Sequence, residues 1–261
     1  MTDDVIRIDL DHRGVATLWL ARAQKHNALS AELIAALTAA ADRLGADPDV
    51  RVVVLAGEGK SFCAGGDLRW MQAQMTADAE TRAAEAQKLA GMLEALNALP
   101  KPLIGRVHGN TFGGGVGLAC VCDVTVGAEG AEFGFTETRL GLIPATIGPH
   151  VVGRMGSAMA RRVFMSARLF DAAEAVSLGI LARAVPLEAL DAAIEAEVAP
   201  YLACAPGAVA EAKALARALG PRVTPDVMDA SIDALIRRWE SDEARDGIAA
   251  FFDRRTPPWA G

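Results

Sequence analysis

The sequence is poor in aromatic residues and contains no long apolar run. Phenylalanine, tryptophan and tyrosine make up 5% of its 261 residues, and only one of them is tyrosine. A surface that stacks sugars or nucleic-acid bases relies on aromatic rings, so none is expected. No apolar run approaches the roughly 18 residues that span a bilayer. The acidic start, Met1-Thr2-Asp3-Asp4, is unlike a basic targeting leader. We therefore expect a cytoplasmic protein without a membrane partner.

Cysteine is also scarce, and its spacing excludes two common uses. The four cysteines form neither a CxxC pair nor the pattern of a zinc site or a disulfide framework. We expect reduced thiols and no metal. Cys63 has no basic partner at a recognisable spacing, so we interpret it as a packing residue. The cysteines are Cys63, Cys120, Cys122 and Cys204.

Positive charge is too sparse for a nucleic-acid surface. Twenty-six basic residues stand against 33 acidic ones, a net charge of −7, and no basic run occurs. Such a chain repels a phosphate backbone, so a nucleic-acid partner is not expected. Hydrophobic residues reach 52%, which is enough for a sizeable core in a chain of this length.

The first half of the chain alternates strand and helix patterns. Strands near residues 52 and 104 enclose a helical stretch, the order of a right-handed crossover between parallel strands. Ser30 is placed to cap a helix that ends near Gly45. The sequence predicts a hairpin of residues 5–10 and 15–20, further strands at 51–56, 103–107 and 123–126, and helices at 31–44, at 68–98 and from Gly113 toward Cys120.

Beyond Gly156 nearly every segment has a helical pattern. Asp171 is placed to cap a short helix, and amphipathic helices are predicted at 187–203, 207–218, 225–239 and 241–253. We divide the chain into an α/β core, residues 1–195, and a C-terminal helical region, 196–261.

One apolar stripe in that region has little core left to cover within one subunit, so we expect it to contact other subunits. The stripe is Val227, Ile232, Leu235, Ile236 and Trp239.

Two strings imitate nucleotide-binding motifs but lack their defining residues. Gly59-Lys60-Ser61 looks like the end of a P-loop, but Val54 stands where the first glycine is needed. In the glycine cluster, a dinucleotide fingerprint that starts at Gly115 needs its third glycine at Cys120. Neither a P-loop nor a nicotinamide cofactor is therefore expected.

Two glycine-rich turns, each directly after a predicted strand, are the strongest chemical signal. They are residues 61–68 and 109–117. The carboxyl ends of parallel strands are where α/β sheets bind ligands. Glycine lets a ligand oxygen approach backbone N–H groups to about 3 Å, and a helix N-terminus favours negative charge. One donor from each turn would form an oxyanion hole.

The motifs, taken in order, resemble the enoyl-CoA hydratase/isomerase (crotonase) superfamily. The similarity runs nearly end to end through Lys25–Ser30, Ser61–Leu68, Gly113–Asp123, Phe133–Pro144 and Gly247–Pro257. It implies a crotonase-like ββα superhelix core with a C-terminal helical layer. It also implies an acyl-CoA thioester as substrate, with coenzyme A as part of that substrate and no separate cofactor, and assembly as a homo-trimer or hexamer.

The resemblance also assigns roles to individual residues. It places the oxyanion donors on the amides of Gly66 and Gly114, where a side chain at Gly114 should collide with the acyl group or rotate the peptide. Residues expected to line the coenzyme A groove are Ala64, Gly65, Asp67, Leu68 and Gly113, and those expected near its phosphates are Arg22 and Lys25.

Glu137 matches the glutamate that gives or takes the proton on the acyl chain. An apolar pocket can raise the pKa of such a carboxyl toward working pH. Hydratases of the two-glutamate type carry a second carboxylate where this chain has Gly117. Since Gly117 has no side chain, we expect Gly117→Ala to change activity little and Gly117→Glu to supply a second carboxylate.

Three functions remain open from the sequence. The first is hydration of a branched or carboxylated enoyl-CoA, because the motifs look like those of bacterial methylglutaconyl-CoA-type hydratases. The second is a Δ3,Δ2-enoyl-CoA isomerase, which needs one carboxylate. The third is a non-catalytic acyl-CoA-binding or RNA-associated protein, which the retained Glu137 disfavours. A dehalogenase is excluded, because residues 143–146 after Gly141 offer no carboxylate nucleophile.

Overall fold

The central element of the computed structural model, which describes residues 5–260, is a six-stranded sheet in the order β1-β2-β3-β5-β7-β10. Strands β1 (Ile6–Leu10) and β2 (Val15–Leu20) pair antiparallel and form the predicted hairpin. All later pairs are parallel, and the predicted crossover between strands near 52 and 104 is confirmed by the pairing of β3 with β5. The later strands are β3 (Val52–Gly57), β5 (Leu103–Val107), β7 (Val124–Ala128) and β10 (Arg183–Val185).

A smaller sheet lies beyond the carboxyl ends of the main strands. Its order is β4-β6-β8-β9, and its first three strands follow β3, β5 and β7 directly along the chain. Each strand pair then leads into a helical segment, which gives the expected ββα repeat. The strands of this sheet are β4 (Ser61–Cys63), β6 (Asn110–Phe112), β8 (Glu132–Gly134) and β9 (Leu169–Asp171).

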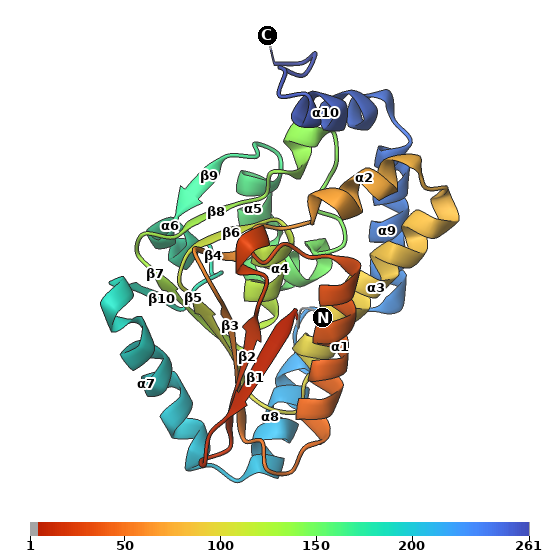
Figure 1. Ribbon diagram of the computed structural model, residues 1–261. Helices are drawn as coiled ribbons and strands as arrows, with labels where there is room; N and C mark the ends of the chain where they lie inside the picture. The colour runs from red at the N-terminus through yellow and green to blue at the C-terminus, as the bar shows by residue number, and fades with distance from the viewer. Residues whose placement is uncertain (1–4, 261) are drawn as a thin grey trace.

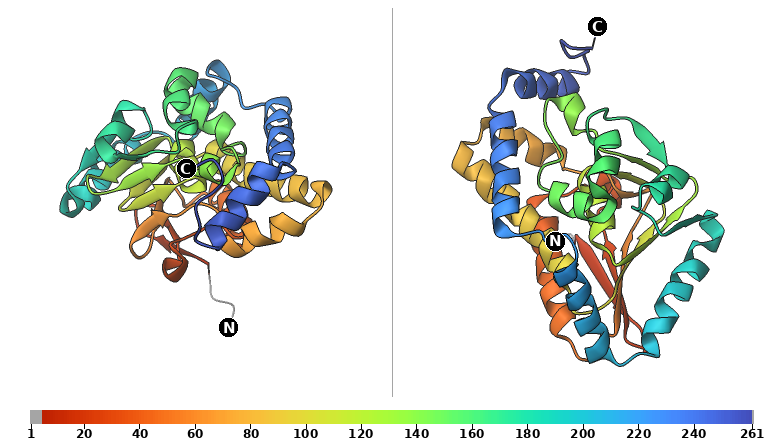
Figure 2. Two further views of the ribbon diagram at one scale, coloured as in Figure 1. Left: turned by 90° about the horizontal axis from the view of Figure 1, so that it is seen from above. Right: turned by 180° about the vertical axis from the view of Figure 1, so that it is seen from behind.

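Helices cover both faces of the main sheet. Figures 1 and 2 show α7 on one side, with α1, α3 and α8 on the other. Within residues 5–260, no helix combines the length and the apolar character needed to cross a membrane. The helices are α1 (Ala31–Ala46), α2 (Leu68–Thr76), α3 (Ala79–Ala98), α4 (Gly114–Val121), α5 (Gly148–Phe164), α6 (Ala172–Ser177), α7 (Leu190–Leu202), α8 (Pro206–Leu219), α9 (Pro225–Trp239) and α10 (Asp242–Phe252).

Side chains along β3 point alternately to the two faces of the main sheet, so each face has its own apolar cluster. Val53 and Leu55 belong to the larger cluster, together with apolar residues of α1, α3, α4 and α5. Val52 and Val54 face the other way and pack with Ile194 and its neighbours on α7. Successive side chains of a strand point to opposite faces, so a strand apolar at every position is buried on both. The main sheet therefore holds the ends of its strands, and the turns that follow them, rigidly.

The long helix predicted over residues 68–98 is in fact two helices. The chain is extended at Ala77, and the side chain of Asp78 accepts a hydrogen bond of 2.8 Å from the N–H of Thr81, which starts α3 afresh. The uninterrupted helix was the wrong prediction because an aspartate inside a helical pattern can act as an N-cap. The predicted cap of α1 is confirmed, since Ser30 accepts from Leu33 N–H, although α1 continues past Gly45 to Ala46.

The apolar stripe of α9 is largely covered within one subunit. Ile232 is 2% exposed and packs with Ala86 and Ala90 of α3, while Trp239 joins a separate cluster under α10. The premise that this stripe lacks a core to cover is therefore wrong, because the sequence did not reveal that α9 packs along α3. The boundary drawn after residue 195 falls inside α7, which packs on the sheet.

Packing of α9 on α3 predicts a stability effect that needs no second subunit. We expect Ile232→Ala to lower the free energy of unfolding by about 2–5 kcal/mol, the usual cost of a buried isoleucine truncated to alanine. Val227→Ala is the control on the same helix, because Val227 is 47% exposed. Urea unfolding at two protein concentrations tests this. An effect that vanished on dilution would contradict packing within one subunit.

Candidate active site

The first glycine turn is held by the segment just before α1. His26 and Asn27 adopt left-handed backbone conformations, with φ of 50° and 54°. The buried amide of Asn27 donates to the carbonyls of Ser61 and Phe62 at 2.9 and 3.1 Å. Asparagine tolerates this backbone region better than most residues. The motif Lys25–Ser30 thus fixes strand β4, from which the first turn emerges.

Backbone pairing around Leu29 leaves one amide of the turn free. The N–H of Leu29 donates to the carbonyl of Gly65 at 2.7 Å, and the N–H of Asp67 donates to the carbonyl of Leu29 at 3.0 Å. Both neighbours of Gly66 are therefore held, while the Gly66 N–H has no acceptor among residues 5–260. An amide fixed in this way is available to a ligand oxygen.

The second turn presents a similar amide at the start of α4. Gly113 has φ of 47°, which favours glycine, and Gly114 is the first residue of the helix. The N–H of Gly114 has no acceptor in the described part of the chain, as expected for a first helical turn. A methyl carbon built on Gly114 would lie 2.5 Å from Cδ1 of Leu29, so a side chain there would displace Leu29 first.

The two turns touch each other, and Glu137 lies against the second one. A methyl carbon built on Gly113 would lie 3.9 Å from Cα of Gly65 and 3.0 Å from Oε1 of Glu137. Glu137 begins the 3-10 helix η2 (Glu137–Leu140), which follows β8. Its Oε2 is buried and has no hydrogen-bond partner within residues 5–260. Burial raises the pKa of this carboxyl to about 7, so Glu137 can both accept and release a proton near neutral pH.

These groups line a cavity of about 400 Å³ with mostly apolar walls. Part of the wall comes from α9 and α10, a contribution that sequence reasoning missed because it assigned the α9 stripe to subunit contacts. The one sequence signal that could have indicated this wall was Trp239, since a large aromatic residue commonly lines a pocket. The wall residues from these helices are Leu235, Trp239 and Phe251.

Seven of the ten residues expected at the site lie around this cavity. They are Ala64, Gly65, Gly66, Leu68, Gly113, Gly114 and Glu137. The other three lie outside its lining. Asp67 is buried, caps α2 through the N–H of Arg69, and pairs with Arg22 at 3.0 Å. Lys25 is exposed at the end of the short helix η1 (Ala23–Lys25). The Arg22–Asp67 ion pair thus stabilises the first turn from outside the cavity lining.

The space beside Gly117 is already filled. A methyl carbon built on Gly117 would lie 2.6 Å from Cγ2 of Ile147 and 3.0 Å from its Cβ. The assumption of free space beside Gly117, on which the expectations for Gly117→Ala and Gly117→Glu rest, is therefore wrong. Ile147 lines the cavity, so the wall is apolar where that carboxylate would have to fit.

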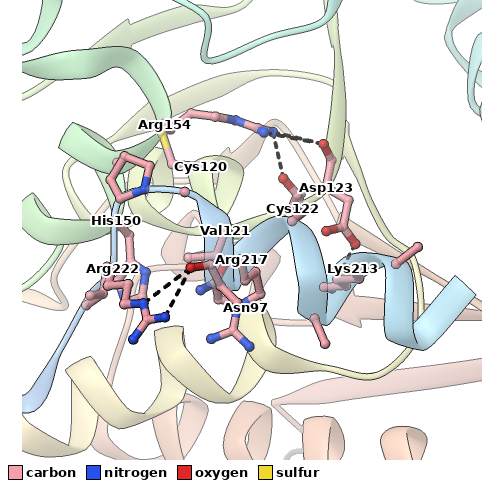
Figure 3. Close-up of a pocket in the computed structure, with 18 of the residues that line it drawn as sticks. Asn97, Cys120, Val121, Cys122, Asp123, His150, Arg154, Lys213, Arg217 and Arg222 are labelled. Carbon is pink, nitrogen blue, oxygen red and sulfur yellow. Dashed lines mark hydrogen bonds and ion pairs between the residues drawn. The ribbon is translucent and has the colours of Figure 1, made fainter.

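A larger cavity, of about 900 Å³, lies elsewhere and has a different character (Figure 3). Neither glycine turn nor Glu137 lines it. Its cations already bind protein groups: Arg154 donates to the carbonyl of Cys122 at 2.6 Å, and Lys213 pairs with Asp123 at 2.8 Å. Cys63 offers no second reactive centre, because burial raises the pKa of its thiol to about 12. The smaller cavity is the candidate active site.

Burial of Glu137 predicts a pH-dependent stability penalty. The folded pKa of about 7 exceeds the usual 4.5, so the folded state binds more protons and the free energy of unfolding falls as pH rises between these values. Glu137→Gln removes this titration and should gain stability relative to wild type from pH 5 to pH 8, by roughly 3 kcal/mol at most. Urea unfolding measures the difference, with the exposed Glu132→Gln as control. Parallel pH curves for wild type and Glu137→Gln would contradict the burial.

Comparisons with known proteins agree with this geometry. The sequence matches the family described as enoyl-CoA hydratase/isomerase over residues 11–261. A solved enoyl-CoA hydratase from Mycobacterium avium has a TM-score of 0.85 and 30% identity, covering 99% of this chain and 100% of that one. Another, from Shewanella pealeana, has a TM-score of 0.80 and 34% identity, covering 98% and 96%. Mouse mitochondrial methylglutaconyl-CoA hydratase is 31% identical over 100% of this chain and 85% of that protein. The family match spans nearly the whole chain, and the chain therefore belongs to the enoyl-CoA hydratase/isomerase family.

Proposed function

We propose that this protein hydrates an enoyl-CoA thioester. The observation that carries the proposal is the arrangement of Glu137 beside the two glycine turns. Its buried carboxyl has a pKa of about 7 and lines the same cavity as Gly66 and Gly114, whose amides have no acceptor among residues 5–260. A thioester carbonyl bound to both amides would be stabilised as it becomes an enolate, with roughly 2.7–4 kcal/mol from each donor.

One carboxylate is enough to complete the addition of water. Ionised Glu137 takes a proton from water as the water oxygen bonds to the β-carbon, and the double-bond electrons move onto the thioester oxygen. The neutral carboxylic acid then returns that proton to the α-carbon as the enolate collapses. Glu137 ends the cycle ionised, and water has been added across the double bond. A pKa near 7 suits a group that must act first as base and then as acid.

The acyl group proposed is branched or carboxylated. Arg139 supports a carboxylate, because it is the one cationic side chain that lines the cavity within the described residues. No carboxylate among residues 5–260 pairs with its guanidinium, so it is available to a negatively charged acyl group. The relative from mouse is named for methylglutaconyl-CoA, which agrees with this choice.

Isomerisation of a Δ3 to a Δ2 double bond is the second candidate. Ile147 favours it, since it occupies the space beside Gly117 and leaves Glu137 as the carboxylate of the cavity. A single carboxylate can remove the α-proton, and the resulting acid can protonate the γ-carbon of the dienolate. The names of the solved relatives favour hydration.

Replacement of the catalytic carboxyl tests the proposed function. We expect Glu137→Gln to lower turnover by about 10²–10⁴-fold, the usual contribution of a positioned acid/base group. Crotonyl-CoA, a branched enoyl-CoA and a glutaconyl-type CoA are the substrates, and ultraviolet absorbance is the readout. Hydration removes the absorbance of the conjugated double bond, whereas isomerisation of a 3-enoyl-CoA creates it. Wild-type protein that does neither, or a Glu137→Gln variant that keeps more than about a tenth of the activity, would contradict the proposal.

We also propose that the protein assembles as a trimer or a dimer of trimers. Leu215 and Leu219 of α8 support an association surface, because they are 60% and 79% exposed. We expect light scattering at micromolar concentration to give three or six times the subunit mass, and Leu219→Lys to shift it downward because it places charge in that surface. A monomer mass for the wild-type protein would contradict the proposal.

A further inference from the structure

The C-terminal helices touch the catalytic turn backbone to backbone. A methyl carbon built on Gly247 of α10 would lie 2.6 Å from the carbonyl carbon of Leu140. One built on Gly141 would lie 2.5 Å from the carbonyl carbon of Glu243. Gly141 also has φ of 72° and ends η2, the short helix that starts at Glu137. Two glycines therefore allow one turn of α10 to sit directly on the turn that carries the catalytic carboxyl.

A single peptide group connects this contact to Glu137. Nε of Arg238, near the end of α9, donates to the carbonyl of Gly141 at 2.9 Å. The N–H of Leu142 donates to the carbonyl of Glu137 at 3.1 Å. The Gly141 carbonyl and the Leu142 N–H belong to the same planar peptide, so neither can turn without the other. A charge-assisted bond at the carbonyl also polarises the peptide and strengthens its N–H as a donor.

Arg238 is itself held in place on both sides. Its guanidinium pairs with Glu243 at 2.5 Å, and its carbonyl accepts from the hydroxyl of Ser241 at 2.6 Å. Glu243 compensates the positive charge locally, so a long-range field at Glu137 is not the main effect of Arg238. Its influence on Glu137 is therefore one of position. The neighbouring Arg237 is exposed on the same helix, and its guanidinium makes no ion pair within the part of the chain that the structure describes.

We propose that Arg238 is a positioning residue for Glu137, acting through the Gly141–Leu142 peptide. The bond holds the catalytic turn against α10 and keeps the carboxyl buried beside the two free amides. Without it, the peptide loses one of the bonds that fix its orientation, the Leu142 N–H turns away from the Glu137 carbonyl and leaves it only the Gly141 N–H, and water reaches the carboxyl. This inference rests on the proposed function, in which Glu137 is the acid and base.

The first test compares Arg238→Met with Arg237→Met. Arg238→Met should lower kcat about tenfold or more, because misplacing a catalytic group by a fraction of an ångström is costly, while KM changes little. Arg238→Lys should recover part of kcat, since it restores a donor. Arg237→Met should match wild type in both. Equal kcat for Arg238→Met and wild type would overturn the proposal.

A second measurement needs no turnover and separates the two proposals. The pKa of the Glu137 carboxyl is read by carbon-13 NMR of glutamate-labelled protein, with Glu137→Gln to assign the signal. In wild type we expect about 7, and in Arg238→Met a fall toward the usual glutamate range as water enters. An unchanged pKa would overturn the positioning role. If wild type shows the expected pKa but turns over no enoyl-CoA, the proposed function fails while the positioning role survives.

Glycine substitutions give a matched check if Arg238→Met does not fold. Gly247→Ala places a methyl against the backbone of Leu140 and should produce the same fall in kcat and in the pKa of Glu137. Gly207→Ala, on α8, is the control, because nothing lies within 4 Å of the added methyl. A Gly247→Ala protein that keeps both wild-type values would also overturn the proposal.

Discussion

A buried carboxyl with an unpaired oxygen is the constraint around which this site is organised. Oε2 of Glu137 has no partner among residues 5–260, and burial alone holds its pKa near 7. A buried group left without a hydrogen bond is unfavourable, so it persists only where the surrounding structure fixes it. Two parts of the chain supply that structure. The glycine turns that follow the β-strands form one wall of the cavity, and α9 and α10 hold the separate turn that carries Glu137. The site therefore gives up some stability for a carboxyl poised near neutral pH.

The parts of the molecule that local chemistry specifies could be predicted from the sequence. The β1–β2 hairpin, the cap at Ser30 and the crossover from β3 to β5 each follow from residues close together in the chain. The glycine turns were also visible, because glycines in that pattern after a strand have few other uses. Glu137 needed the family resemblance, since nothing in its local sequence distinguishes it from a surface glutamate.

Features that depend on distant contacts could not be predicted in this way. Whether Asp78 continues a helix or caps a new one is decided by how α2 and α3 pack, and both outcomes fit the same periodicity. The apolar stripe on α9 correctly predicted a buried helix face. It did not predict what covers that face, which is α3 of the same subunit. Gly117 looked like an open position until Ile147, thirty residues further on, was seen to fill it. Periodicity identifies a buried face; only tertiary structure identifies what covers it.

The position of the cavity wall has a consequence for how the pocket forms. Its floor comes from strand–turn–helix units that are local in sequence, but Leu235, Trp239 and Phe251 come from helices about a hundred residues after Glu137. Contacts that span long stretches of chain form late, because closing the intervening loop costs entropy first. A folding chain should therefore pass through a state with its glycine turns assembled and Glu137 still open to water. In that state we expect the pKa of the carboxyl to lie in the usual glutamate range, and to rise only when α10 docks and buries it.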